Sequence, residues 1–245
     1  MISRSARISA CALVLVVAGG AGYWQWWANR SPHFLPDDPS AFVAQFAPPG
    51  ASDSPQTRAE LDELLALQAT RTAAALEAAR ADRKKDIRQF YGALGIDPAS
   101  DPSLGPLRDF MDQVESDVGI YVRAAKLRFA RSRPYVIESR LKPCTGDLAD
   151  HQSYPSGHSS YGYVAALVLA DMVPERRQAL LARADEFAHQ RMVCGVHFAS
   201  DVAAGRVAAE WLVAAFAKND GYRSGERAAA RVLRAALVLP PAPPR

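Results

Sequence analysis

Residues 106–134 read PLRDFMDQVESDVGIYVRAAKLRFARSRP, and this stretch gives the strongest structural signal in the chain. Its apolar residues recur three and four positions apart, the spacing that places side chains on one face of an α-helix. They are Leu107, Phe110, Met111, Val114, Val118, Tyr121, Val122 and Ala125. Because proline disfavours the helical conformation in the residue before it, we expect the helix to end before Pro134. The pattern predicts an amphipathic helix with one face in a protein core.

Further helix signals lie on both sides of this stretch. Apolar residues alternate with charged ones over 57–90, a pattern typical of a long amphipathic helix. Four more helices are predicted at 158–172, 174–193, 197–216 and 224–239. Strand signals are weak, with neither alternating apolar runs nor Asn-Gly hairpin turns. The sequence therefore predicts an all-α protein, a helical bundle whose core forms between packed helices.

The first 28 residues differ from the rest. Arg4 and Arg7 precede an apolar run over 8–22, and tyrosine and tryptophan residues follow up to position 27. The pattern is typical of a cleaved signal peptide, although 8–27 is also long enough to be an N-terminal membrane anchor with its aromatic residues at the interface. On either interpretation we expect a periplasmic or secreted protein, attached to the inner membrane if the leader is retained.

Composition divides the exported part into three segments. Residues 29–56 are rich in Pro, Ser, Asp and Gly and show no period, which predicts a linker or an extended arm. Residues 57–239 contain the helix signals and form one domain, and 240–245 are a Pro-rich tail. Nothing in the sequence indicates the oligomeric state.

Charge and cysteine content narrow the partners and the compartment. Without residues 1–28 the formal net charge falls from +3 to +1, so nucleic acid is not expected as a partner. Cys11 lies in the leader, which leaves Cys144 and Cys194 as an even pair in an oxidising compartment. We expect a disulfide between them; the alternative is two buried free thiols.

Polar residues that helix packing does not require gather in three places. The first is the end of the helix quoted above, where Lys126 and Arg133 are seven residues apart. In one continuous helix they would differ by only about 20° around the axis, so both cations would point the same way. The alternative is two solvated charges on an exposed face.

The second place is Ser153-Tyr154-Pro155-Ser156-Gly157-His158, directly before an apolar helix. Free backbone N–H groups and the helix dipole make such a start an anion site, at which Gly157 permits close approach and Ser156 adds a hydroxyl donor. His158 would be a proton donor beside the bound anion. The alternative is an ordinary turn with Ser156 as N-cap and His158 on the surface.

The third place runs from Gln190 and Arg191 to His197 and Asp201. At positions i and i+4 of one helix, the Asp201 carboxylate would reach an imidazole nitrogen of His197. That contact would fix the tautomer and leave the other nitrogen free as a base or nucleophile. The alternative is plain surface stabilisation by the pair.

Together the three places resemble the signature of the type 2 phosphatidic acid phosphatase (PAP2) and vanadium haloperoxidase superfamily. In order they read Lys126-x6-Arg133-Pro134, Pro155-Ser156-Gly157-His158 and Arg191-x5-His197-x3-Asp201. Within that superfamily, the stretches 153–158 and 194–197 are most similar to the bacterial class A nonspecific acid phosphatases. The resemblance covers roughly 104–212 and makes 57–239 an acid phosphatase domain of this type. One departure is Gln190, where the family usually has serine.

The resemblance implies a metal-independent acid phosphatase, without a cofactor, that acts on small-molecule phosphate monoesters. His197 would attack phosphorus to form a phosphohistidine, Asp201 would hold His197, and His158 would protonate the leaving group. The phosphate-binding residues would be Lys126, Arg133, Ser156, Gly157 and Arg191. The same resemblance leaves open a lipid phosphate phosphatase and a vanadate-dependent haloperoxidase. A noncatalytic phosphate-binding helical protein is the alternative from another class.

Overall fold

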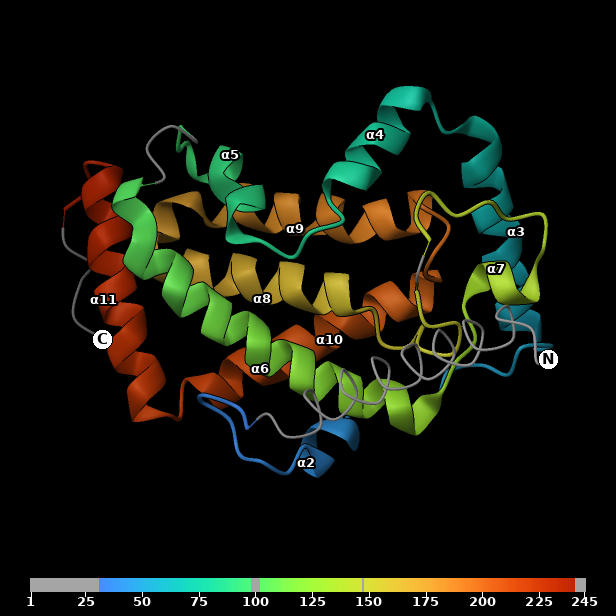
Figure 1. Ribbon diagram of the computed structural model, residues 1–245, viewed down its shortest axis with the longest axis horizontal. Helices are drawn as coiled ribbons and strands as arrows, with labels where there is room; N and C mark the ends of the chain where they lie inside the picture. The colour runs from blue at the N-terminus through green and yellow to red at the C-terminus, as the bar shows by residue number, and fades with distance from the viewer. Residues whose placement is uncertain (1–30, 98–101, 147, 241–245) are drawn as a thin grey trace, which may run out of the picture. The chain divides into compact units, whose positions relative to one another are not determined.

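The fold is built around helix α8 (Gly157–Met172), which lies among four other long helices (Figure 1). The computed structural model describes residues 31–97, 102–146 and 148–240, and the unit described below begins at His33. Twelve of the sixteen residues of α8 are buried, because the helix is apolar on every side. It packs against α6 (Gly105–Phe129), α9 (Arg177–Val193), α10 (Ala199–Phe216) and α11 (Asp220–Ala236).

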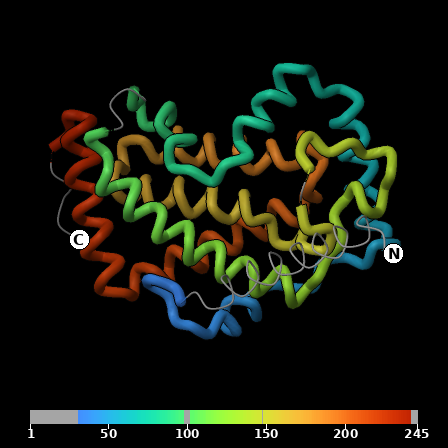
Figure 2. Tube along the Cα trace, viewed as in Figure 1, coloured from blue at the N-terminus to red at the C-terminus, as the bar shows by residue number. Residues whose placement is uncertain are grey.

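Shorter elements complete the architecture. They are α2 (Ser40–Val43), α3 (Pro55–Thr70), α4 (Ala73–Ala81), η1 (Ile87–Phe90), α5 (Tyr91–Leu94), α7 (Pro134–Ile137) and η3 (Pro174–Arg176). The described residues contain no strand, so the prediction of an all-α protein is confirmed. Figure 2 shows the same path as a Cα trace, with α11 and α3 at opposite ends of the bundle. Among the described helices, none has both the length and the hydropathy that a bilayer span requires.

Helix α6 has the predicted apolar face, since all eight of the apolar residues that the period selects are buried. It ends at Phe129, however, where Ala130 adopts a left-handed backbone conformation (φ 45°). The helix thus stops three residues before the last position that Pro134 would allow. Residues 130–133 leave the helix, and this places Arg131 and Arg133 on a connecting segment.

The prediction of one long helix over 57–90 is wrong, because the helical conformation is interrupted between α3 and α4. Arg71 leaves the helical region (ψ 129°), and the Thr72 hydroxyl accepts a hydrogen bond from Ala75 N–H as the N-cap of α4. Arg71 also donates to the carbonyl oxygens of Val193 and Lys142, at 2.9 and 2.7 Å. These contacts to distant segments favour the break.

The described part of the segment predicted as a linker or an arm packs onto the bundle. Phe42 of α2 is fully buried and contacts the rings of Tyr121 and Trp211, at 5.5 and 5.3 Å between centroids. Leu35 and Phe46 are buried in the same core. The composition signal missed these anchors because single aromatic residues in a Pro-rich stretch have no period. The leader and residues 241–245 lie outside the described residues.

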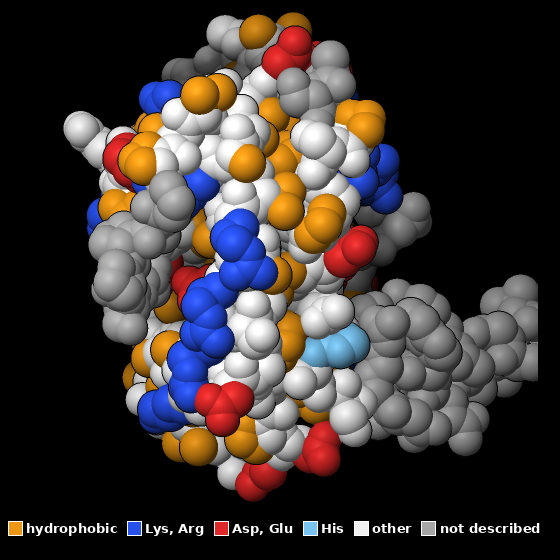
Figure 3. All heavy atoms as spheres, turned by 90° about the vertical axis from the view of Figure 1, so that its left-hand side faces the viewer, with side chains coloured by type: hydrophobic (Ala, Val, Ile, Leu, Met, Phe, Trp, Pro, Cys, Tyr) orange, Lys and Arg blue, Asp and Glu red, His pale blue; other side chains and the backbone are white. Residues whose placement is uncertain are grey.

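Helix α11 is strongly amphipathic. Its buried residues Ala229 and Leu233 face α6 and α8, while Arg223, Arg227 and Arg231 recur one turn apart on the other side. The space-filling view of this end shows a row of basic side chains beside apolar ones (Figure 3). Arg227 and Arg231 are exposed, as expected for the solvent face of a helix that covers one end of a core.

Candidate active site

The three cations and two imidazoles of the sequence motifs line one pocket of about 190 Å³, and Asp201 lies behind it. None of the described residues around this pocket is acidic. The lining consists of Lys85, Val118, Gly119, Val122, Arg123, Lys126, Arg133, Leu148, Gly157, His158, Arg191 and His197. The structure therefore brings together positions from α6, α8, α9 and the two segments that follow α6 and α9.

Lys126 and Arg133 both line the pocket, but the prediction that one helical face brings them together is wrong. They do not share a helical face, because α6 ends at Phe129 and Arg133 is the residue before α7. The Arg133 guanidinium is held by the carbonyl oxygens of Ala149 (3.0 Å from Nε) and Val196 (2.9 Å from Nη1). Lys126 donates to the carbonyl oxygens of Gln152 and Ser153. Hydrogen bonds to backbone segments distant in sequence therefore fix the positions of both cationic side chains.

Gly157 begins α8 at the edge of the pocket, as the anion-site prediction requires. Ser156 is buried and does not line the pocket. Its hydroxyl oxygen accepts a hydrogen bond from Ser159 N–H at 3.3 Å, which makes it the N-cap of α8. Its own N–H donates to the carbonyl oxygen of Asp201 at 2.9 Å. A role for Ser156 in binding phosphate stays a prediction.

The tautomer of His158 follows from its partner. Its Nε2 lies 2.7 Å from the carbonyl oxygen of Arg83, and a carbonyl oxygen only accepts, so Nε2 carries a hydrogen. Nδ1 is then the nitrogen that has no hydrogen in the neutral ring. Burial, followed by the charge of Arg191, lowers the pKa of His158 well below its ordinary value.

His197 and Asp201 are in contact, but not as positions i and i+4 of one helix. Helix α10 begins at Ala199, so His197 precedes its N-cap, Phe198. Asp201 lies in the first turn, where its Oδ2 accepts from Phe198 N–H at 2.9 Å and lies 3.2 Å from His197 Nδ1. The carboxylate reaches the imidazole because both side chains lie at the N-terminus of α10.

The two nitrogens of His197 have different partners. Arg133 Nη1 lies 3.2 Å from Nε2, and because a guanidinium only donates, Nε2 is an acceptor and Nδ1 carries the hydrogen toward Asp201. Burial and the nearby charge of Arg133 lower the pKa of His197 to about 3. His197 is therefore a neutral imidazole with a lone pair on Nε2, the form that a nucleophile needs.

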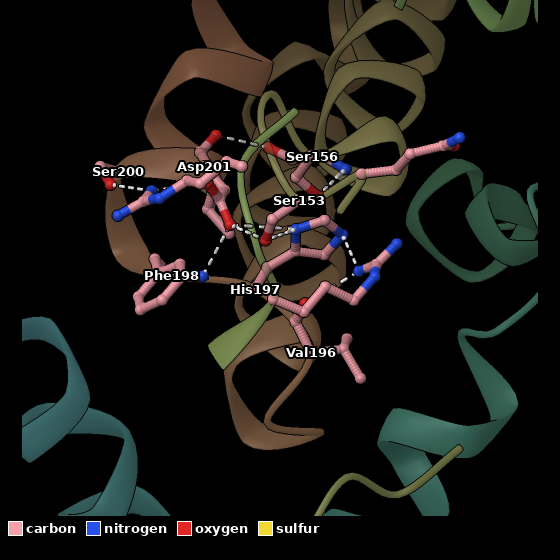
Figure 4. A network of polar contacts seen from close by, with 12 residues as sticks. Ser153, Ser156, Val196, His197, Phe198, Ser200 and Asp201 are labelled. Atoms are coloured by element: carbon pink, nitrogen blue, oxygen red, sulfur yellow. Dashed lines mark hydrogen bonds and ion pairs between the residues drawn. The ribbon is translucent and has the colours of Figure 1, made fainter. Parts of the chain in front are cut away.

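Asp201 stays ionised although it is fully buried. Burial by itself raises the pKa of Asp201, but hydrogen bonds from His197 and Ser153, together with the charge of Arg131, lower it below its ordinary value. Ser153 Oγ donates to Oδ2 at 2.5 Å, and Arg131 Nη1 donates to Oδ1 at 2.7 Å. Figure 4 shows Ser153 and His197 beside the carboxylate of Asp201.

Arg191 is a buried cation whose hydrogen bonds are incomplete. Its side chain is 1% exposed, and within the described part of the chain Nε and Nη1 have no hydrogen-bond partner. Burial and the charge of Arg133 lower the pKa of Arg191 to about 10, so it remains charged at neutral pH. Unpaired donors on a buried cation are costly unless an anion accepts from them. Gln190, in place of the family's serine, also leaves its buried Oε1 unpaired there.

Three polar residues behind the pocket have no role in the sequence prediction. Ser153 and Arg131 contact Asp201, and Glu60 of α3 accepts from Arg131 Nη2 at 2.9 Å. Ser153 and Arg131 lie inside or beside the motifs, but Glu60 is one of many charged residues in an amphipathic helix. No periodicity or spacing distinguishes it.

The predicted disulfide between Cys144 and Cys194 is confirmed, with an S–S distance of 2.00 Å. It joins the segment after α7 to the turn that follows α9, next to Arg191 and His197. Among the described residues, no three His, Cys, Asp or Glu side chains are grouped so that they could hold a metal ion.

Comparison with known proteins agrees with the geometry. The model of the PAP2 superfamily matches residues 118–224. The chain is 32% identical over 206 residues to an acid phosphatase of Zymomonas mobilis, an alignment that covers 79% of this chain and 74% of that protein. It is 32% identical over 138 residues to a non-specific acid phosphatase of Providencia stuartii, covering 55% of each chain.

Two further likenesses are shorter or more distant. Over 92 residues the chain is 46% identical to a non-specific acid phosphatase of Salmonella typhimurium, covering 36% of this chain and 37% of that protein. The alignments to the Providencia and Salmonella proteins thus span about half and about a third of their lengths. A bacterial vanadium-dependent iodoperoxidase shares the fold, with a TM-score of 0.56, 21% identity, and coverage of 72% of this chain and 53% of that one. The family match, the Zymomonas relative and the fold together show that this chain belongs to the PAP2 superfamily.

Proposed function

We propose that this protein is an acid phosphatase that hydrolyses small-molecule phosphate monoesters through a phosphohistidine on His197. One observation supports the proposal most strongly: the three motif cations Lys126, Arg133 and Arg191 line a single pocket together with two imidazoles, and none of its described lining residues is acidic. A phosphate dianion would satisfy the unpaired N–H groups of Arg191 and balance the charges of Lys126 and Arg133. The acid phosphatases that the chain resembles support the same activity.

In the first step, His197 Nε2 attacks phosphorus while Asp201 holds the Nδ1–H group. The P–N bond forms as the P–O ester bond breaks, and the departing alkoxide takes a proton from His158. The three cations stabilise the charge on the non-bridging oxygens in the transition state, with the two guanidinium groups suited to bidentate contact. Arg133 would move its hydrogen bond from Nε2 to a phosphate oxygen.

In the second step, water attacks the phosphohistidine. His158, now neutral, takes a proton from this water, the P–N bond breaks, and inorganic phosphate leaves with His197 neutral again. Since the cations supply the charge stabilisation that a metal ion would otherwise give, we expect no metal requirement and full activity in EDTA. We also infer that the protein is exported, periplasmic or secreted, on the evidence of its leader.

Hydrolysis of a chromogenic aryl phosphate by wild type and His197→Ala, with EDTA and across pH, tests the proposal. Wild type should show an acidic optimum, because the pKa values of both histidines are lowered and the reaction needs His197 neutral and His158 protonated. The His197→Ala variant should lose at least about 10³-fold in kcat, as for loss of a covalent nucleophile. His151→Ala is the matched control, because His151 is an exposed histidine between α7 and α8 that does not line the pocket.

Equal rates for wild type and His197→Ala would refute the phosphohistidine. Loss of activity in EDTA, restored by a divalent cation, would refute metal independence. Bromide oxidation that requires vanadate and peroxide, without phosphatase activity, would assign the pocket to peroxidase chemistry instead.

A further inference from the structure

Arg131 occupies a buried position between two carboxylates. Its Nη1 donates to Asp201 Oδ1 at 2.7 Å, and its Nη2 donates to Glu60 Oε2 at 2.9 Å. The guanidinium lies over the ring of Phe198 at 3.9 Å from the centroid, and Phe198 is fully buried. Arg131 Nη1 also donates to Ser200 Oγ at 2.7 Å. Stacking and hydrogen bonds together fix the plane of this side chain.

Glu60 connects this arginine to a second point on the nucleophile's segment. Its other oxygen, Oε1, accepts from Ser200 N–H at 2.6 Å, at the start of α10. Glu60 is on α3, outside the residues 118–224 that the family model matches, and its exposed fraction is only 8%. A buried carboxylate so far from the motifs in sequence, with both oxygens engaged, is more than surface charge.

We propose that Glu60 and Arg131 are positioning residues, which hold Asp201 and through it His197, so that helix α3 is part of the active site's support. This inference rests on the proposed function of His197. The chain of contacts runs from Glu60 through Arg131 and Asp201 to the imidazole, and each link is a direct hydrogen bond. Figure 4 shows the last link, between Asp201 and His197. Neither Glu60 nor Arg131 lines the pocket, so neither touches the substrate.

The charges in this chain act on His197 in opposite directions. Glu60 is an anion that balances Arg131, and removing it would leave an additional net positive charge near the imidazole. Removing Arg131 would do the reverse and leave Asp201 with Glu60 as two buried anions. The other charged or titratable groups around His197 are Asp201 and, in the pocket lining, Lys85, Arg123, Lys126, Arg133, Arg191 and His158. The two substitutions replace none of these residues.

The geometry also explains why position 131 has an arginine. Two nitrogens of one planar guanidinium reach carboxylates on α3 and α10 at the same time. A lysine ammonium is a compact charge on a flexible stem and would favour one of the two. Arg131→Lys therefore keeps the charge while it loosens the connection between the helices.

Four variants test the inference in the aryl phosphate assay: Glu60→Gln, Arg131→Gln, Arg131→Lys and the control Glu63→Gln, an exposed residue of the same helix. Glu60→Gln should lower kcat about tenfold, with KM within about twofold, because the phosphate-binding cations are untouched. The acid limb of kcat/KM should move to lower pH in Glu60→Gln and to higher pH in Arg131→Gln, each by about half a unit or more. Arg131→Lys should lower kcat without moving the limb.

Shifts in the same direction, or kinetics like wild type in both charge-removing variants, would overturn the inference and leave the two residues with a structural role alone. Far-UV circular dichroism and melting temperature identify any variant that fails to fold. If a charge-removing variant fails to fold, the kcat of Arg131→Lys tests the inference instead, and a wild-type kcat in Arg131→Lys would overturn it. The imidazole ¹⁵N signals of His197, assigned by their loss in His197→Ala, give its titration without any activity. If wild type proves inactive, the proposed function fails, while opposite shifts of this titration would still support the positioning role.

Discussion

Lys126 is the cation whose charge depends most on its surroundings. Within the described part of the chain, its ammonium donates to two backbone carbonyl oxygens, those of Gln152 and Ser153, and to no side chain. Burial, and then the charge of Arg133, lower the pKa of Lys126 to about 7. In the proposed mechanism the protonated form binds phosphate, and this form is lost as pH rises through 7. The free protein should therefore bind anions more weakly on the alkaline side.

Replacement of Lys126 by arginine tests this at the level of one residue. Between pH 6 and 8 the charged fraction of a group with a pKa of 7 falls about tenfold, so the Kd of wild type for inorganic phosphate should rise by about that factor relative to the variant. Isothermal titration calorimetry of both proteins with inorganic phosphate measures the two Kd values at each pH. The ratio of the two Kd values cancels the effect of the titration of phosphate itself. A pH-independent ratio would contradict the lowered pKa.

The residues that sequence could and could not predict differ in one respect. Lys126, His158, Arg191 and His197 belong to short motifs and were predicted, and the structure places them around one pocket. Glu60 belongs to no motif, and what distinguishes it is its contacts with residues 71 and 140 positions away. A local pattern contains no information about such a partner.

At the scale of helices, the two imidazoles are held in register by the contact between α8 and α10. Ser159 Oγ donates to the carbonyl oxygen of Val202 at 2.7 Å, and Ser156 N–H donates to that of Asp201 at 2.9 Å. The backbones approach closely because position 205 is glycine. A Cβ there would lie 2.5 Å from Ser159 Cβ and 2.9 Å from Ser160 N.

Gly205→Ala should therefore force α8 and α10 apart. Because one of the close contacts is backbone, we expect a loss of stability of about 2 kcal/mol, and a fall in kcat as His158 moves away from His197. Gly92→Ala is the control, since a Cβ at this helical position meets nothing within 4 Å and should leave stability unchanged or slightly higher. Chemical denaturation measures both; equal stabilities would show that the helices can adjust.

At the scale of the whole molecule, three segments distant in sequence meet beside the pocket. The disulfide joins Cys144 to Cys194, and Cys144 N–H donates to the carbonyl oxygen of Cys194 at 2.9 Å. Arg71, at the break between α3 and α4, donates to both of these segments through the carbonyl oxygens of Lys142 and Val193. Together they fix the turn between Arg191 and His197.

Reduction of the disulfide should lower activity before it unfolds the protein. The cross-link contributes roughly 4 kcal/mol in the chain-entropy picture, yet the helical core does not depend on it, whereas the turn before His197 does. Activity and far-UV circular dichroism, followed together during titration with a reductant, measure the two losses. The double variant Cys144→Ser/Cys194→Ser should be insensitive to the reductant. Parallel loss of activity and helix content in wild type would contradict the prediction.

The sequence alone determined that the protein is all-α, where most helices lie, and which motif residues belong together. Helical periodicity and short motifs are local, so one chain displays them without its fold. Tertiary structure alone decided where α6 ends, why α3 and α4 separate, and how Glu60 and Arg131 reach the segment that contains His197 and Asp201. These features depend on hydrogen bonds and packing between residues 70 or more positions apart, and only the folded chain brings such residues into contact.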